Sequence, residues 1–121
     1  MPMNETINYI EFGSRHLAAS KSFFEHAFGW RFTDYGADYT AFEGGGLQGG
    51  LFRSERASRA EQGGALLVLF SEDLEASLEK VSALGAQICR PIFPFPGGRR
   101  FHFVEPGGNE LAIWSDKEPN P

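Results

Sequence analysis

The sequence predicts an α+β fold made of two βαβββ modules. Three observations predict it: a weak internal repeat at an offset of 57 residues, a helix in each half that ends at a glycine, and three short strand-like segments after each helix. A chain of 121 residues is long enough for one domain with a single core. We therefore expect one domain over residues 1–121, with the first module at about 7–52, a linker at 53–64 and the second module at about 65–115.

The repeat aligns two segments that share the order strand, turn, helix and glycine. They are INYIEFGSRHLAASKSFFEHAFGW and ALLVLFSEDLEASLEKVSALGAQI. In the second segment Ser71 is the expected helix N-cap, and the apolar positions 74, 78, 81 and 84 form one stripe. Gly85 is expected to end this helix, as Gly29 ends the first. Both stripes predict helices that cover the core.

Strand-like segments separated by turn residues follow each helix. The first set is WRFTDY, YTAFE and LQGGLF, and the second is AQICRPIF, RRFHFV and NELAIWS. The glycine-rich run 44–50 lacks the ending of a phosphate loop, so we interpret it as a place where the backbone bends or approaches a ligand closely.

Composition excludes several classes of function. A formal net charge of −5 opposes binding to nucleic acid or to an anionic membrane. No apolar run approaches the roughly 20 residues of a membrane span, and the N-terminus lacks a signal-peptide pattern, so we expect a cytoplasmic protein. Cys89 is the only cysteine, which excludes an internal disulfide. Twelve Phe, three Tyr and two Trp indicate an aromatic-lined cavity for a small-molecule ligand.

Two segments carry a resemblance to a known family. IEFGSRHLAASKSFFEHAFGW looks like the first strand, helix and aromatic pair of the vicinal oxygen chelate superfamily, and FHFVEPGGNELAIW looks like its terminal turn and last strand. That superfamily includes glyoxalase I, bleomycin-resistance proteins, fosfomycin-resistance enzymes and extradiol dioxygenases. Glu105 stands where the turn usually has Asp. The resemblance implies one cupped, barrel-like mixed sheet around a shared cavity, with helices outside, and a homodimer.

The resemblance also points to the places where metal-dependent members hold their ion. Transferred by position, these places are Tyr9, about Gly50, Leu66 and Ala112. Divalent ions prefer imidazole, carboxylate or thiolate ligands, and a phenol has an ordinary pKa of about 10. We therefore expect no metal cofactor, and a divalent metal is the alternative.

Strand alternation selects the polar residues that should face the cavity. Glu110 lies two residues from Ala112 and should share its face, and Tyr9 and Glu11 should point inward on the first strand. If Phe101 and Phe103 take the core side, the residues between and beside them point into the cavity. The candidate catalytic residues are Glu11, His102 and Glu110, and the candidate ligand-binding residues are Tyr9, Arg100, Trp114 and Phe95, beside an apolar wall of Leu66, Val68 and Phe70.

Structural roles for these residues stay open. Glu110 is either a ligand contact or a carboxylate held by Arg100 or a turn amide, and His102 is either functional or a satisfied structural group. A replacement metal site made of Glu11, His102 and Glu110 is a further alternative. The segment RPIFPFPGGRR is either a rigid lip that offers Phe93 and Phe95 to a ligand or a hairpin that covers a sheet edge.

Two functional hypotheses follow. In the first, the protein binds a small, partly aromatic or cationic molecule without metal, as bleomycin-resistance proteins bind their antibiotic. In the second, it is a metal-dependent lyase or isomerase of the glyoxalase type, with Glu110 or Glu11 as the base. Whether the protein is an enzyme is left open by the sequence.

Overall fold

The computed structural model describes residues 2–119, in which the element order β-α-β-β-β occurs twice. The first module contains β1 (Tyr9–Ser14), α1 (Leu17–Phe28), β2 (Arg31–Asp34), β3 (Tyr39–Glu43) and β4 (Gln48–Arg53). The second contains β5 (Leu67–Phe70), α2 (Leu74–Ala83), β6 (Gln87–Phe95), β7 (Gly98–Val104) and β8 (Glu110–Ser115). A short 3₁₀-helix at Ala60–Gln62 lies between the modules. The predicted α+β class is confirmed.

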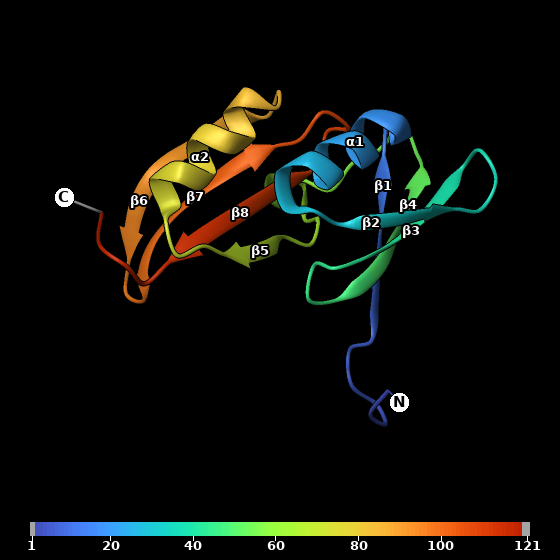
Figure 1. Ribbon diagram of the computed structural model, residues 1–121, viewed down its shortest axis with the longest axis horizontal. Coiled ribbons are helices and arrows are strands. Elements are labelled where there is room, and N and C mark those ends of the chain that lie inside the picture. The colour runs from blue at the N-terminus through green and yellow to red at the C-terminus, as the bar shows by residue number, and fades with distance from the viewer. Residues whose placement is uncertain (1, 120–121) are drawn as a thin grey trace.

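Each module folds its strands into one four-stranded mixed sheet. The strand orders are β1-β4-β3-β2 and β5-β8-β7-β6. In both sheets the first strand of the module pairs in parallel with the last, and the other pairs are antiparallel. Within residues 2–119 no strand pairing joins the two sheets, so they stand side by side without closing into a barrel (Figure 1).

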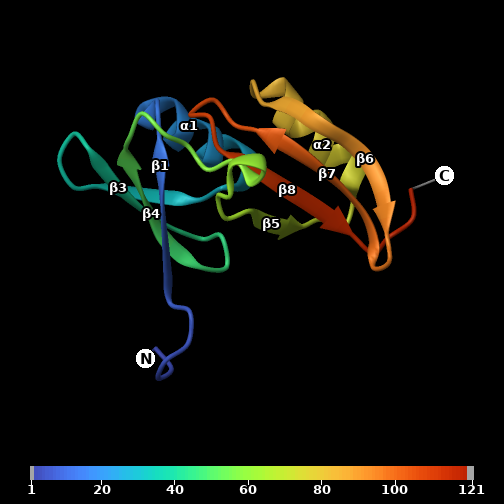
Figure 2. The ribbon, with the colours of Figure 1, turned by 180° about the vertical axis from the view of Figure 1, so that it is seen from behind.

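Both helices lie on one side of the sheets, the near side in Figure 1. Figure 2 shows the opposite side, which α1 and α2 leave uncovered and which we call the open face of each sheet; the linker with its 3₁₀-helix lies in front of the start of β8 on this side. In the second module the open face carries Val68, Phe70, Arg100, His102, Glu110 and Trp114, which alternate along their strands with buried core residues. No helix in residues 2–119 has the length and apolar character that crossing a membrane requires.

Helix α1 joins the two modules through one continuous core. Its residues Phe23 and Phe28 contact Phe103 of β7, with ring centroids 5.9 Å and 6.4 Å apart. Phe24 stacks on Trp30 at 4.5 Å, and Trp30 stacks on Phe42 of β3 at 4.7 Å. Stacked and edge-on aromatic pairs of this kind add to the stability gained from burial. Much of the phenylalanine content therefore belongs to the core.

The helix ends follow the sequence signals with one correction. Gly29 has a φ of 72° after α1, and Gly85 has a φ of 98° just after α2, both in the left-handed region that glycine tolerates. The N-cap of α2 is Asp73, whose carboxylate accepts the Ala76 amide. Ser71, the predicted cap, instead accepts the amide of Asp73, because the helix begins two residues later than expected.

A buried polar junction ties the terminal turn to the first module. Asn109 donates from Nδ2 to the carbonyl of Gly13 at 2.8 Å and to Glu105 at 2.7 Å, and its Oδ1 accepts the Ser58 amide at 2.8 Å. Glu105, only 1% exposed, also accepts a hydrogen bond from Ser20 of α1 at 2.8 Å. The glutamate that replaces the usual aspartate thus serves as a structural acceptor.

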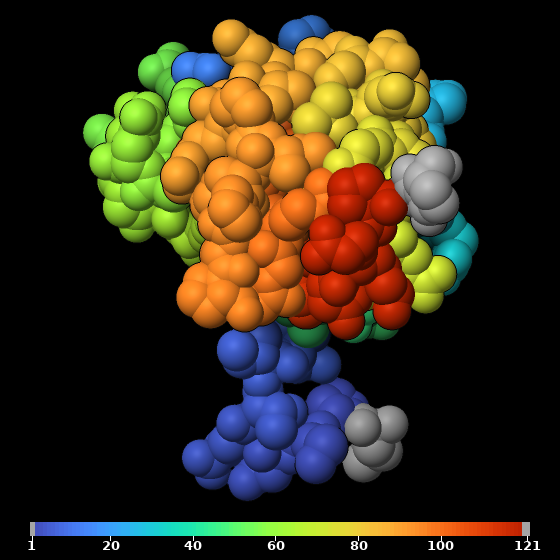
Figure 3. Space-filling model, turned by 90° about the vertical axis from the view of Figure 1, so that its left-hand side faces the viewer, coloured from blue at the N-terminus to red at the C-terminus, as the bar shows by residue number. Residues whose placement is uncertain are grey.

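The second module contains a long hairpin formed by β6 and β7. β6 runs continuously through its prolines to Phe95 and pairs with β7, with register shifts between Ile88 and Arg90 and between Arg90 and Phe93. The segment forms a hairpin, whose Phe95 also lines the cavity described below. Figure 3 views the molecule from the β6 edge and shows the exposed N-terminal segment projecting below the body.

Candidate functional site

Two predicted site residues form a buried pair on the open face of the second sheet. His102 on β7 and Glu110 at the start of β8 lie on neighbouring antiparallel strands. Nδ1 of His102 is 2.8 Å from Oε2 of Glu110, and the residues are only 4% and 6% exposed. Both side chains therefore lie on the same face of the sheet, as the alternation of side chains along the strands predicted.

Glu110 is held as an anion by donors from the linker. Its Oε1 accepts the amide of Ala60 at 3.1 Å and Nε of Arg59 at 3.4 Å. Burial, the largest single influence, would raise the pKa of Glu110, but the hydrogen bonds from His102, Ala60 and Arg59 together lower it below its ordinary value. Arg100, one of the holders predicted for this carboxylate, contacts His102 instead, and the amide that Glu110 accepts belongs to Ala60, at the start of the 3₁₀-helix in the linker.

The contact between Arg100 and His102 fixes the histidine tautomer. Nε and Nη2 of Arg100 lie 3.2 Å and 2.9 Å from Nε2 of His102. A guanidinium can only donate hydrogen bonds, so Nε2 must carry a lone pair, and the ring proton sits on Nδ1 and is donated to Glu110. His102 is therefore neutral, and the three side chains form a directed chain from guanidinium to imidazole to carboxylate.

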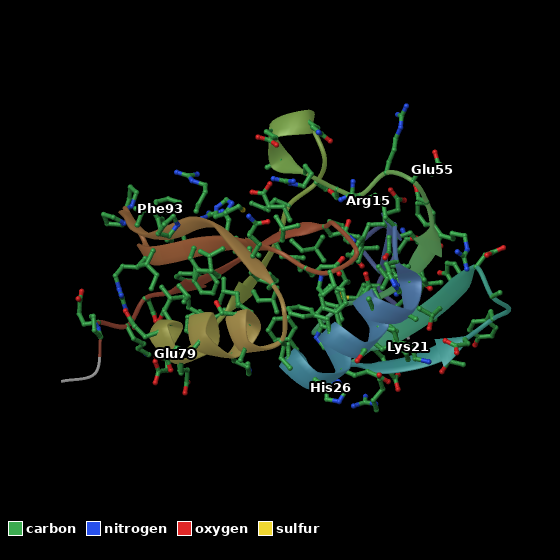
Figure 4. All side chains as sticks on the ribbon, turned by 90° about the horizontal axis from the view of Figure 1, so that it is seen from above. Arg15, Lys21, His26, Glu55, Glu79 and Phe93 are labelled. Carbon is green, nitrogen blue, oxygen red and sulfur yellow. The ribbon has the colours of Figure 1, made fainter. Side chains whose placement is uncertain are left out.

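Aromatic side chains surround the guanidinium of Arg100. Its Cζ lies 5.9 Å from the ring centroid of Phe93 and 5.8 Å from that of Phe95, within the range of a cation–π contact. Trp114 lies edge-on to Phe95 at 6.1 Å and to Phe70 at 5.1 Å. Figure 4 labels Phe93 on the side of the sheet away from α2, opposite the labelled Glu79.

A shallow cavity lies against this aromatic wall. Its volume is about 410 Å³, and it is lined by Val68, Phe95, Gly97, Arg100, Trp114 and Asp116. Three of the four residues predicted to bind a ligand, Arg100, Trp114 and Phe95, therefore share one surface. The fourth, Tyr9, belongs to a different sheet.

Tyr9 and Glu11 form a second polar group on the open face of the first sheet. The hydroxyl of Tyr39 donates to Glu11 at 2.8 Å and shares a short hydrogen bond with the hydroxyl of Tyr9. Burial, followed by the bonds with Tyr9 and Glu11, raises the pKa of Tyr39 well above its ordinary value. No hydrogen bond within residues 2–119 links this group to His102 or Glu110, so the structure arranges the predicted polar residues as two groups.

Three contributors to these groups were absent from the sequence-based set. Arg59 and Ala60 belong to the linker, and a backbone amide leaves no mark in a sequence pattern. Tyr39 alternates with buried Thr40 on β3, so its side of the strand was predictable, but its position above Gly50 depends on strand register.

Cys89 is half-buried and lines a cavity of about 260 Å³ beside His102 and Glu110. Burial, followed by the charge of Glu110, raises the pKa of its thiol, which favours the unreactive protonated form.

Neither the places where metal-dependent members hold their ion nor the pair His102 and Glu110 offers donor atoms that fit a divalent ion. Ala112 is apolar, and the space above Gly50 is filled by the phenol of Tyr39. His102 and Glu110 satisfy each other, and the remaining ring nitrogen of His102 faces a guanidinium, which would repel a cation. Within residues 2–119 no group of three or more His, Cys, Asp or Glu side chains is arranged to hold a metal.

Comparisons with known proteins agree with this fold. A sequence model of the glyoxalase/bleomycin resistance protein/dioxygenase superfamily matches residues 6–113. A search of curated proteins found no match. The chain is similar in structure to the fosfomycin resistance protein FosX from Listeria monocytogenes, with a TM-score of 0.76, 18% sequence identity, and coverage of 93% of this chain and 94% of that one.

Two further solved structures show the same likeness. A glyoxalase/bleomycin resistance protein/dioxygenase family enzyme from Burkholderia phytofirmans PsJN has a TM-score of 0.75 at 12% identity, with coverage of 92% and 98%. A lactoylglutathione lyase from Agrobacterium tumefaciens has a TM-score of 0.69 at 18% identity, with coverage of 92% and 93%. At these identities the structures support the fold alone, while the family match spans most of the sequence. The chain therefore belongs to the glyoxalase/bleomycin resistance protein/dioxygenase superfamily.

Proposed function

We propose that this protein binds a small molecule with an aromatic part on the open face of its second module, and that it does so without a divalent metal. The observation that carries the proposal is the cavity of about 410 Å³ in which Phe95 and Trp114 stand beside Arg100. Ligand pockets of this size combine apolar walls with a few polar groups that fix orientation.

The chemistry of the donor atoms supports binding without metal. A metal at His102 would have to displace the guanidinium of Arg100 from Nε2 and compete with the proton shared with Glu110. Both costs oppose the glyoxalase-type lyase or isomerase, whose carbonyl substrate needs a bound Lewis acid.

A screen of small aromatic compounds tests the proposal. Thermal unfolding of the protein should shift upward with at least one compound, in a concentration-dependent way, because a ligand that binds only the folded state stabilises it. Trp114→Ala should abolish the shift, whereas the exposed Tyr35→Ala, on a β2–β3 turn, is the matched control. A flat response across acids, neutral compounds and amines at millimolar concentration would overturn the proposal.

We further propose a homodimer that covers the open face of the first sheet and leaves the cavity beside Arg100 on the second sheet accessible. On the first sheet Tyr9 and Phe52 are each 42% exposed. Apolar groups of this size, gathered on one side of the molecule, are typical of an interaction surface. Sedimentation equilibrium should give twice the mass of the chain, and Phe52→Glu should shift the protein toward the monomer. A monomer at all concentrations would rule the dimer out.

A further inference from the structure

The guanidinium of Arg100 is oriented by a neighbouring side chain, His102, and its charge is not neutralised by that neighbour. His102 accepts from Nε and Nη2 of Arg100 through a neutral ring nitrogen, which orients the guanidinium without cancelling its charge. No carboxylate in residues 2–119 forms an ion pair with Arg100, although carboxylates pair with Lys21, Arg31, Arg53, Arg59, Arg99 and Lys117. The cation therefore keeps hydrogen-bonding capacity for a further partner.

The carboxylate of Glu110 is engaged by other partners. The imidazole ring separates Glu110 from Arg100, and the carboxylate faces Arg59 and the amide of Ala60 on its other side. The one acid that lines the cavity, Asp116, is exposed, and its Oδ1 lies 3.7 Å from Nζ of Lys117. Arg100 is therefore the one cation that lines the cavity, and no carboxylate in residues 2–119 forms an ion pair with it.

The surroundings of Arg100 define a complementary ligand. Phe95 and Trp114 offer ring faces and edges on the same cavity, and Val68 adds an apolar contact. A flat apolar body fits these side chains, and a planar acid fits the guanidinium, which prefers carboxylates because of its fork geometry. A cationic group at the same place would meet the like charge of Arg100.

We propose that the ligand of this face is an aromatic acid, whose carboxylate is held by Arg100 while its ring packs against Phe95 and Trp114, and that His102 and Glu110 are positioning residues for the guanidinium. This inference rests on the proposed function and narrows its ligand class. Of the aromatic and cationic molecules that the sequence suggested as ligands, the cationic ones are therefore disfavoured on this face.

Three probes with the same ring system separate the ligand classes. They are 2-naphthoate, 2-naphthamide and 2-naphthylmethylamine, titrated into the protein by isothermal calorimetry at pH 7.5 in about 50 mM salt, where screening is moderate. We expect 2-naphthoate to bind about ten- to hundredfold more tightly than 2-naphthamide, because a hydrogen bond to a charged partner is worth more than one between neutral groups. The amine should bind most weakly.

The outcomes distinguish this inference from the proposed function. Equal binding of the acid and the amide, or tighter binding of the amine, would overturn the proposal that the ligand is an acid. It would leave the proposal that the face binds an aromatic molecule standing. Failure of all three probes at millimolar concentration would overturn both. Inorganic phosphate as a competitor shows whether a bare anion suffices: displacement of 2-naphthoate by phosphate at equal concentration would contradict a role for the ring.

Variants at two positions test the assignment of Arg100 and His102. Arg100→Gln should lower the affinity for 2-naphthoate about ten- to hundredfold and leave that for 2-naphthamide within about twofold. His102→Leu removes the acceptor for Arg100 and should reduce the ratio of acid to amide affinity several-fold, whereas His102→Gln keeps an acceptor and should retain most of it. A merely structural histidine would affect both probes equally. If His102→Leu does not fold, the comparison of Arg100→Gln with Arg100→Lys decides the matter, and an unchanged ratio in Arg100→Gln would refute the proposal.

Discussion

The hydroxyl of Tyr39 occupies the space in which a side chain at Gly50 would begin. A Cβ built at Gly50 collides with the Tyr39 phenol, which reaches across from β3 to hydrogen-bond Glu11 on β1. The φ angle of Gly50 is not positive, so its backbone conformation does not require glycine. The glycine is required instead by the neighbouring side chain of Tyr39.

Gly50→Ala should therefore destabilise the protein by about 1–3 kcal/mol, because the added methyl overpacks a filled space. Urea unfolding measures this cost. In a Tyr39→Ala background the same substitution should cost less than about 0.5 kcal/mol, since the obstacle is gone, and a double-mutant cycle isolates the coupling. An equal cost in both backgrounds would show that Tyr39 is not the reason for the glycine.

Strand alternation explains why part of the site was predictable. Arg100, His102, Glu110 and Trp114 were expected on one face, and they lie on it because successive side chains on β7 and β8 point to opposite sides of the sheet. The partner of Glu110 was harder to predict, since the Ala60 amide comes from a linker whose path depends on the whole fold.

The grouping of the polar residues was also beyond the sequence. Tyr9 and Glu11 were expected to share a cavity with His102, because the resemblance implied one barrel-like sheet. The structure instead forms two sheets, and each open face carries its own polar group. Periodicity along a strand reveals which side a residue takes, but it contains no information on how two sheets are placed.

Acid should weaken the protein through Glu110. The folded-state pKa of this carboxyl is lowered from an ordinary value of 4.5, so its contribution to stability is present above that value and is lost as the pH falls through the folded pKa. Urea unfolding between pH 7 and pH 3 should show a decline that is shallower in Glu110→Gln. Parallel declines in the two proteins would mean that Glu110 is not stabilised as an anion.

Asn109 should be the most sensitive residue of the module junction. Asn109→Ala removes three buried hydrogen bonds, to Gly13, Glu105 and Ser58, and strands their partners, so we expect a loss of about 2–4 kcal/mol in the free energy of unfolding. Asn4→Ala is the matched control, because Asn4 is exposed and donates to the side chain of the adjacent Glu5, and it should change stability by less than about 0.5 kcal/mol. Similar small effects of Asn109→Ala and Asn4→Ala would show that the buried hydrogen bonds of Asn109 contribute little to the stability of the protein.

Metal retention is the measurement that separates the two functional hypotheses most directly. After incubation with excess nickel, zinc, manganese or iron and desalting, elemental analysis should find far less than one equivalent bound, because Nε2 of His102 faces Arg100 and Glu110 is taken up by His102, Arg59 and Ala60. Arg100→Ala removes the competing cation and is the variant in which weak retention would appear first, with His102→Gln as its control. One equivalent in the unaltered protein, lost in His102→Gln, would instead show that the guanidinium yields to the ion, and would make the glyoxalase-type reaction the leading explanation of the site.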